Sequence, residues 1–345
     1  MADPVEIKNQ LKAEALRLGF VLAGVTLPLQ TPHFPAYEAW LKAGLHAGMA
    51  YLGSERALTG RRDPASLLPG CRSILVLAFP YAPPTPVPPR PGYGKIAAYA
   101  AGPDYHNTLP PRLERLACFL QTLTPQPFAW KACVDSAHLL ERDLAVQAGL
   151  GWVGRNTCLI HPRLGSWFFL AELMLTLELP PDLPYTDHFC GACRRCIEAC
   201  PTGCLGENRQ LDARRCLSYL TIENRESIPP ELRPALKSQV FGCDICQTVC
   251  PWNARSHAAP TCDNEIDLLE TIHLSPAEFK TRYSATPLQR ARRRGLLRSA
   301  FAVLGNSGTA VHLPALENFV QYEMDPELRE AAAWAQDQIR RRINP

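Results

Sequence analysis

The cysteines of this chain have a spacing that indicates iron–sulfur chemistry. Four cysteines and a proline form a first motif: Cys190, Cys193, Cys196, Cys200 and Pro201. This is the spacing C-x2-C-x2-C-x3-C-P, in which three thiolates hold one 4Fe–4S cluster and the fourth reaches a second cluster. A shorter copy follows as Cys243, Cys246, Cys250 and Pro251.

The shorter motif needs one more cysteine, and Cys216 is the upstream candidate. With this addition, the crossed arrangement sorts eight thiolates into two sets. The first cluster is predicted to be held by Cys190, Cys193, Cys196 and Cys250. The second cluster is predicted to be held by Cys200, Cys216, Cys243 and Cys246. Cys204 is left over, and we interpret it as a small buried residue.

Zinc and disulfides are the alternatives to clusters. Pairs with the spacing C-x2-C also hold structural zinc, but zinc does not explain two motifs that end in Cys-Pro. A disulfide framework is typical of small secreted domains. This chain has 345 residues, and nine of its 14 cysteines lie between positions 190 and 250. The clustering therefore favours metal binding.

The N-terminal half must contain whatever receives the electrons. Asp135 follows a short apolar stretch, where catalytic acids are often placed, but the residues by themselves favour an N-cap of a helix. Arg142 lies two turns further on and could contact an anion or extend along the surface. Gly149, Gly151 and Gly154 have the letters of a dinucleotide motif, yet they follow a predicted helix instead of a strand, which argues against NAD. They fit a tight turn that brings the backbone close to a bulky ligand.

Composition indicates an ordinary globular protein, with 46% hydrophobic and 20% charged residues. Neither a signal peptide nor an apolar run long enough to cross a membrane is recognisable, so we expect a cytoplasmic protein with no membrane partner. The net charge of +3 is small. Arginines nevertheless gather near the C-terminus, at positions 290, 292, 293, 294, 298 and 340–342. Such groups are typical of a phosphate-binding face or of a solvated helix surface.

Periodicity predicts the elements that position these residues. Helices are expected over 5–24, 108–124 and 136–149, the last capped by Asp135 or Ser136, and strands over 73–79 and 166–179. Alternating helices and strands suggest an α/β core up to about residue 180. Helical segments at 296–306, 313–316 and 328–335 look like pairs of a short HEAT-like repeat.

Taken together, these segments resemble epoxyqueuosine reductases over nearly the whole chain. The resemblance is carried by residues 134–137 with 141–142, 151–157, 165–172, 190–201, 215–223 and 242–253. His138 and Arg155 depart from the usual pattern of the family.

The resemblance implies an α+β (α/β-like) fold in three parts. Residues 1–184 would form a cobalamin-binding reductase core akin to that of reductive dehalogenases. Residues 185–258 would form a ferredoxin-like domain with two 4Fe–4S clusters. Residues 259–345 would form a HEAT-like tail that helps to hold the anticodon stem-loop of tRNA. The family reduces epoxyqueuosine to queuosine at the wobble position of the anticodon. Electrons would come from an external low-potential donor, and nothing demands more than a monomer.

The resemblance also assigns residues. Asp135 would be the proton donor to the departing oxygen, a general-acid role that needs a pKa raised by burial near the corrin. Residues expected to contact cobalamin are Arg62, Asp135, Arg142, Asn156, Leu159, Leu170, Ser218 and Thr221. The arginines between 290 and 298 would contact the tRNA backbone.

Two other functions fit parts of the sequence. A corrinoid and iron–sulfur reductase could act on a small halogenated or epoxidised molecule, but such a substrate needs no basic helical tail. An electron carrier with two clusters would need no N-terminal domain of this size.

Overall fold

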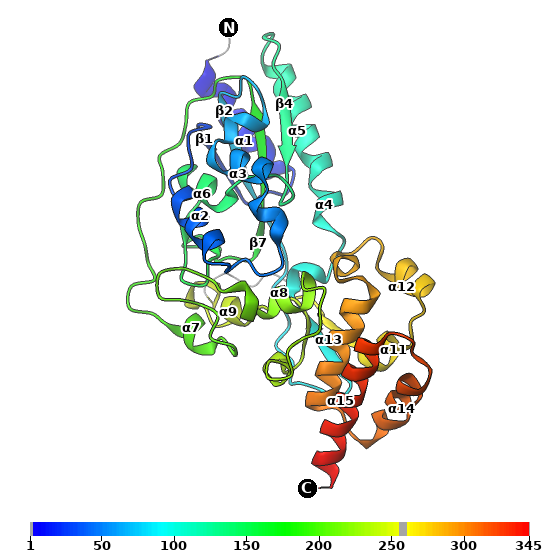
Figure 1. Ribbon diagram of the computed structural model, residues 1–345. Coiled ribbons are helices and arrows are strands. Elements are labelled where there is room, and N and C mark those ends of the chain that lie inside the picture. Colours follow the sequence, from blue (N-terminus) through cyan, green and yellow to red (C-terminus); the bar gives the residue numbers. More distant parts are fainter. Residues whose placement is uncertain (1–2, 255–260, 345) are drawn as a thin grey trace.

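The computed structural model describes residues 3–254 and 261–344. Its N-terminal half is built on a four-stranded sheet with the strand order β1-β2-β7-β4 (Figure 1). The strands are β1 (Leu22–Thr26), β2 (Ser73–Pro80), β7 (Phe168–Leu175) and β4 (Trp130–Cys133). All pairings in this sheet are antiparallel. The fold is therefore α+β. Helices and strands do alternate along this half of the chain, but the α/β core suggested by the sequence is wrong, because neighbouring strands of the sheet are antiparallel.

Helices cover both faces of this sheet. One face packs against α1 (Pro4–Arg17) and α5 (Pro110–Leu123), where residues such as Leu11, Leu113 and Leu173 form one apolar cluster. The other face packs against α6 (Glu141–Gln147), through Leu144 and Met174. Three further helices belong to this half of the chain: α2 (Phe34–Lys42), α3 (Glu55–Arg62) and α4 (Tyr105–Thr108).

Two helix predictions in this half were wrong in their bounds. The helix expected over 5–24 ends at Arg17, because Gly19 adopts a positive φ of 95° and starts a reversal into β1. The helix expected from 136 begins only at Glu141, and residues 135–140 form an irregular turn. Predicted strands at 73–79 and 166–179 are present as β2 and β7.

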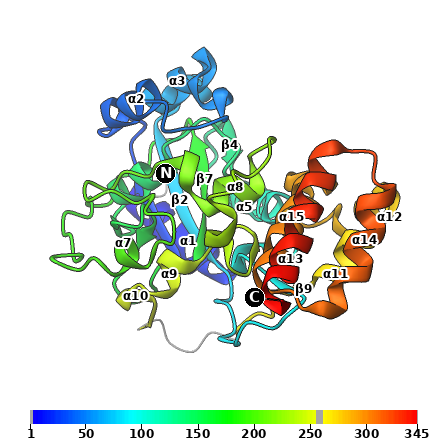
Figure 2. The same ribbon diagram turned by 60° about the horizontal axis from the view of Figure 1, so that its bottom comes forward.

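The cysteine-rich part consists of short helices joined by loops. They are α7 (Arg195–Ala199), α8 (Leu217–Ile222), α9 (Ile245–Thr248) and α10 (Pro251–Ala254). Helices α7 and α9, one from each cysteine motif, contact each other, as Figures 1 and 2 also show. A small hairpin of β5 (Trp152–Val153) and β6 (Leu159–Ile160) packs against them through Trp152 and Cys250.

A second sheet joins segments that are far apart in the sequence. Its order is β8-β3-β9, with β3 (Tyr93–Ile96), β8 (Gln239–Phe241) and β9 (Glu265–Asp267). Each strand comes from a different one of the three predicted domains. The predicted boundaries at residues 184 and 258 therefore do not separate the three segments completely, because each segment contributes one strand to this sheet.

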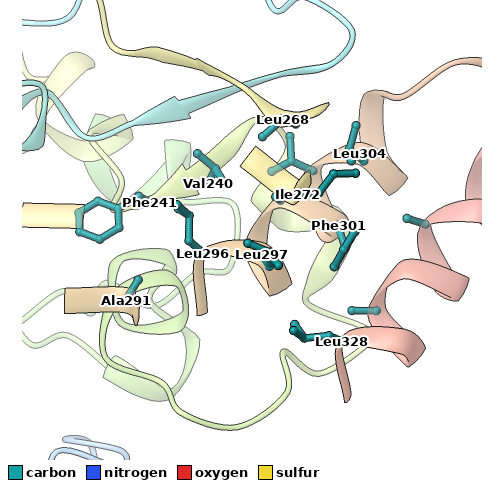
Figure 3. Packing of buried hydrophobic residues seen from close by; sticks show 14 of the residues in the cluster. Val240, Phe241, Leu268, Ile272, Ala291, Leu296, Leu297, Phe301, Leu304 and Leu328 are labelled. Carbon is teal, nitrogen blue, oxygen red and sulfur yellow. The ribbon is translucent and has the colours of Figure 1, made fainter. Parts of the chain in front are cut away.

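The C-terminal part is a group of helices to one side of the main sheet (Figure 2). They are α11 (Leu268–His273), α12 (Pro276–Tyr283), α13 (Arg292–Ser307), α14 (Leu313–Tyr322) and α15 (Pro326–Ile343). Helix α13 is central, and its Leu296, Leu297 and Phe301 are fully buried (Figure 3). The same cluster contains Val240 and Phe241 of β8, so the tail is fixed to the cysteine-rich part by a continuous apolar core.

Candidate active site and cysteine groups

Asp135 lies in the turn that follows β4 and has a strained backbone. Its φ is 52°, a left-handed conformation that costs energy for a residue with a side chain. Its backbone N–H donates to Oε1 of Glu141 at 2.7 Å, which holds the turn in place. Asp135 is therefore not the N-cap of α6, and the capping interpretation is wrong. A strained residue held by a buried partner is typical of a functional site.

The carboxylate of Asp135 contacts a histidine that bridges two acids. Nε2 of His106 lies 3.1 Å from Oδ2 of Asp135, and its Nδ1 lies 2.7 Å from Oδ1 of Asp104. Asp104 is only 2% exposed. Nη2 of Arg290, from the C-terminal part, lies 2.9 and 3.0 Å from the two ring nitrogens. Four ionisable side chains from three segments of the chain thus meet at one point.

These contacts decide where a proton is held. Burial opposes ionisation of Asp135, but hydrogen bonds from His106 and Tyr105 and the charge of Arg290 outweigh it and lower its pKa. Burial disfavours the charged form of His106, but hydrogen bonds to Asp135 and Asp104 outweigh burial and raise its pKa. The raised pKa expected for Asp135 is therefore wrong for this arrangement. Protonated His106 is the group that keeps a proton against the ionised Asp135.

Two more carboxyl groups lie behind Asp135. Glu141 begins α6, and Glu172 lies on β7 opposite Cys133 of β4. Burial, and then the charge of Asp135, raise the pKa of Glu141 to about 7. Glu172 is fully buried, and burial together with the charges of Glu141 and Asp135 raises its pKa well above the usual range.

The predicted cobalamin contacts Asn156, Leu159 and Leu170 lie on one side of the main sheet. Leu159 and Leu170 belong to the apolar cluster on the α6 face. Asn156 is 3% exposed; its Oδ1 accepts from the Cys158 N–H at 3.2 Å, while its Nδ2 has no partner among the described residues. A buried amide donor without an acceptor costs free energy unless a ligand supplies one. Cobalamin carries amide groups that can do so, and these residues fit the cofactor.

The other residues predicted to contact cobalamin differ in their exposure to solvent. Arg62 and Arg142 are exposed, and Arg62 stacks on Phe34 with 4.7 Å to the ring centre. Ser218 is half-buried on α8. Thr221 is fully buried, and its hydroxyl donates to Leu217 O at 2.7 Å and accepts from the Gly242 N–H at 2.8 Å. The hydroxyl of Thr221 therefore braces α8 against Gly242, and its contact with the cofactor stays a prediction.

The predicted ligands of the first cluster lie together. Burial, and then the neighbouring Cys190 and Cys193, raise the pKa of Cys250. Burial, together with Cys190 and Cys250, also raises the pKa of Cys196. Cys250 and Cys190 also pack into one apolar group with Trp152. One cysteine of the shorter motif therefore joins three of the longer motif.

The predicted ligands of the second cluster form another group. Burial first, and then Cys216 and Cys200, raise the pKa of Cys243, to about 12. Burial first, and then Cys158, Cys243 and Cys216, raise the pKa of Cys246 well above its usual value. Cys158 comes directly before the segment with Leu159, so this group lies beside the predicted cofactor contacts.

Cys204 belongs to this second group and is more than a buried filler. It is 6% exposed, and its Sγ lies 3.4 Å from Sγ of Cys200. Its hydrogen bond lowers the pKa of Cys200 to about 4, and that of Cys216 to about 7. Thiolates are the form that binds iron. A thiol that favours thiolate at two neighbours suits a cluster site.

Comparison with known proteins identifies the family. The model of the family "Epoxyqueuosine reductase QueG, DUF1730" matches residues 61–136. The model of the family "4Fe-4S double cluster binding domain" matches residues 189–253. Epoxyqueuosine reductase of Pseudomonas aeruginosa is 37% identical, over 96% of this chain and 94% of that protein. The Xanthomonas campestris protein is also 37% identical, over 96% of each chain. The chain belongs to the epoxyqueuosine reductase family.

Solved structures of epoxyqueuosine reductases agree with this assignment. The Streptococcus thermophilus structure has a TM-score of 0.87 at 30% identity and covers 97% of this chain and 91% of that one. A structure of epoxyqueuosine reductase with an epoxyqueuosine-modified tRNA-Tyr stem loop has a TM-score of 0.89 at 29% identity, covering 98% and 91%. The chain is thus an oxidoreductase with a mixed α and β fold and a domain for two 4Fe–4S clusters. No helix among the described residues could cross a membrane.

Two features of this chain differ from the sequence-based expectations. A Cβ at Gly151 would lie 2.2 Å from the Ile160 carbonyl oxygen, so this glycine admits the chain's own β6 and not a ligand. The arginines of 290–298 do not form a free basic face. Arg298 is 5% exposed and donates to backbone oxygens of Leu220 and Asn224 at 2.8 and 3.1 Å.

The neighbours of Arg298 are also engaged. Nε of Arg293 donates to Leu274 O at 2.6 Å, and Arg294 pairs with Asp325 at 2.7 Å and with Glu327 at 2.8 Å. Within the described chain, only Arg292 of this group has neither an ion pair nor a hydrogen bond. The sequence pattern of residues 99–106 marks a segment that looks functional, but it gives no individual role to Asp104 or His106, and none was assigned to Glu172. An acid two positions before a histidine was the available signal for the first two.

Proposed function

We propose that this chain reduces epoxyqueuosine to queuosine at the wobble position of a tRNA anticodon, with cobalamin as cofactor. The observation that carries the proposal is the contact of Asp135 with His106, which places an acid at a strained turn in a chain of this family. In a Bacillus subtilis relative with a TM-score of 0.88, a catalytic loop named for its aspartate is swung out of the active site. That aspartate supports a catalytic role for Asp135.

The stoichiometry of the reaction determines how many electrons and protons the chain must supply. Two C–O bonds of the epoxide break, one C=C bond forms, and the oxygen leaves as water, which consumes two electrons and two protons. Asp135 gives a proton to the departing oxygen, and protonated His106 keeps Asp135 supplied through their 3.1 Å contact. Asp104 orients the imidazole from the other side, which is the arrangement that general acid catalysis needs.

The two cysteine groups hold the clusters that carry the electrons. Cys190, Cys193, Cys196 and Cys250 bind the first cluster. Cys200, Cys216, Cys243 and Cys246 bind the second. An external low-potential donor reduces them one electron at a time. Cobalamin, when bound, supplies a reduced metal centre that can act on the carbon of the substrate.

Several residues hold the cofactor. Asn156 donates its unpaired amide N–H, Leu159 and Leu170 provide an apolar surface, and Ser218, Arg62 and Arg142 supply polar contacts at the rim. Asp135 lies at the same site. Cys158 directly precedes Leu159 and lies close enough to Cys246 to raise its pKa. The second cysteine group is therefore near the proposed cofactor contacts, which supports electron transfer from the second cluster.

The C-terminal helices are proposed to hold the tRNA, in the manner of a HEAT-like tail. Arg292 and Arg341 are exposed and unpaired within the described chain, so their charges are available for phosphate. A solved relative is bound to a tRNA stem loop, which supports this partner.

Anaerobic reconstitution with iron, sulfide and cobalamin, followed by assay on tRNA carrying epoxyqueuosine, tests the proposal. We expect queuosine from the wild type and none from Asp135→Asn with both cofactors bound. Loading of both cofactors without turnover would move the substrate to a small halogenated or epoxidised molecule. A wild type that binds clusters but no corrinoid would indicate an electron carrier.

A further inference from the structure

The reaction proposed above consumes two protons, whereas the contact of Asp135 with His106 holds one. Two acids near Asp135, Glu141 and Glu172, have no part in the mechanism proposed above. Glu172 is fully buried, and among the described residues no donor other than the neighbouring acid Glu141 reaches its carboxyl oxygens. An ionised carboxylate in such a place would be very costly, so Glu172 is held as the neutral acid.

The surroundings of Glu172 explain why it stays neutral. It lies between Val76 of β2 and Cys133 of β4 in the sheet, and its face packs under α6. Its charged neighbours are Glu141 and Asp135, and both are acids. Lys131 of β4 acts on Cys133, opposite Glu172, and two further cations act on Glu141. They are Arg142 of α6 and Arg61 of α3, and they do not outweigh burial and Asp135 there.

Glu141 connects this buried acid to the active site. Its Oε1 accepts from the backbone N–H of Asp135 at 2.7 Å. A proton carried by Glu141 therefore sits on the other oxygen, next to the residue that loses its proton in the reaction. A carboxyl group thus lies behind Asp135, with the fully buried Glu172 as its neighbour on the interior side.

We propose that Glu141 and Glu172 store a proton behind Asp135 and return it to the Asp135 carboxylate during turnover. The O–H bond of Glu141 breaks, an O–H bond forms on Asp135, and the charge left on Glu141 is stabilised by Arg142 and by sharing the proton of Glu172. With the proton held by His106, the chain then supplies both protons, while the clusters supply both electrons. The pair acts through Asp135 and does not touch the substrate. This inference rests on the proposed function.

The first test is infrared spectroscopy of the reconstituted enzyme in H2O and D2O. The variants are Glu172→Gln and Glu141→Gln, with Glu178→Gln as the matched control because Glu178 is exposed beyond the end of β7. At about pH 8.5, where acids of ordinary pKa are ionised, we expect a protonated-carboxyl band that shifts in D2O. It should be absent from Glu172→Gln and present in the control. A second band should titrate with a midpoint near the Glu141 pKa of about 7 and be absent from Glu141→Gln.

The second test is the single-turnover rate as a function of pH. We expect Glu141→Gln and Glu172→Gln to be at least about tenfold slower than the wild type below pH 7, with cluster and cobalamin loading unchanged. The difference should shrink above pH 7, where Glu141 of the wild type is ionised. A purely structural defect would instead slow the reaction equally at all pH values.

Two results would overturn the inference. One is the absence of a protonated-carboxyl band assignable to Glu172 at about pH 8.5. The other is a wild-type rate and pH profile in both variants. If the wild type does not turn over the modified tRNA, the proposed function falls and the supply role falls with it. The infrared bands still decide independently whether the pair stores a proton.

Discussion

Nη2 of Arg290 lies within 3.0 Å of both ring nitrogens of His106, although 184 positions separate the two residues in the chain. The segment before α13 therefore completes the site around Asp135. The helices proposed to hold tRNA and the residues proposed to handle protons are joined at this contact.

Replacement of Arg290 by Gln should raise the pKa of His106 further. The charge of Arg290 lowers this pKa in the wild type, and its removal leaves Asp104 and Asp135 to favour the imidazolium. Titration of the His106 ring by NMR measures the effect. Arg292→Gln, which removes an exposed arginine two positions away, is the control and should leave the titration unchanged. A lower pKa in Arg290→Gln would contradict the contact.

Replacement of Glu172 by Gln should flatten the pH dependence of stability. The folded state keeps the Glu172 proton, whereas the unfolded state loses it above about pH 4.3. The stability contributed by this group is complete below that pH and falls as pH rises, by about 1.4 kcal/mol per pH unit. Urea unfolding at pH 5.5 and 8 should show the wild type losing more stability than Glu172→Gln. Equal losses would show that Glu172 is ionised in the folded protein.

Replacement of cysteines should separate ligands from their neighbour. Cys216→Ser is expected to lose the second cluster and roughly half of the bound iron, because each cubane needs its full set of thiolates. Cys204→Ala should keep full iron loading, since Cys204 belongs to neither predicted ligand set and only hydrogen-bonds with the ligands Cys200 and Cys216. Iron analysis and EPR after reconstitution distinguish the two variants. Loss of iron from Cys204→Ala, with full loading of Cys200→Ala, would show that Cys204 and not Cys200 is the ligand.

Two glycines of α13 should respond in opposite ways to alanine. A Cβ at Gly305 would lie 2.1 Å from the Trp334 ring of α15, so Gly305→Ala should lower the free energy of unfolding by about 2 kcal/mol. A Cβ at Gly295 would meet Ala291 at an ordinary 3.5 Å. Gly295→Ala should therefore stabilise the protein by up to about 1 kcal/mol through helix propensity. Thermal unfolding compares the two, and a stable Gly305→Ala would mean that α13 and α15 pack less closely.

Charge reversal at Arg292 should weaken tRNA binding more at low salt than at high salt. A phosphate contact releases counterions, so its loss reduces the slope of log K against log salt by about 1. Arg294→Gln is the comparison, because Arg294 already pairs with Asp325 and Glu327. A salt dependence unchanged in Arg292→Glu would exclude Arg292 from the tRNA surface.

Local patterns predicted much of this molecule. The strands β2 and β7 are largely apolar runs, with Glu172 as the one charged residue of β7, and the helices of the tail follow regular apolar spacing, so both could be read from the sequence. Strand β1 could not, because Leu22–Thr26 is short, contains Gly24 and directly continues a helical pattern. The cysteine motifs were equally readable, since their spacing alone indicates clusters.

The missed features all depend on contacts between distant segments. Arg298 looked like a surface charge, yet its partner Leu220 lies 78 positions away. The left-handed backbone of Asp135 depends on Glu141 accepting its N–H, and the lowered pKa of Asp135 depends on His106. A single sequence does not indicate which of many charged residues will meet.

The small sheet of β8, β3 and β9 has a consequence for how the chain is made. Strand β3 leaves the ribosome early, but its partners β8 and β9 are synthesised about 140 and 170 residues later, and pairing at such separation is slow. Until then the nascent chain carries an unpaired strand edge, which other chains can join. Termination of synthesis before residue 267 would leave that edge open permanently. Premature stop codons and slow translation near the 3′ end of the message should therefore produce aggregates more readily than partial enzymes.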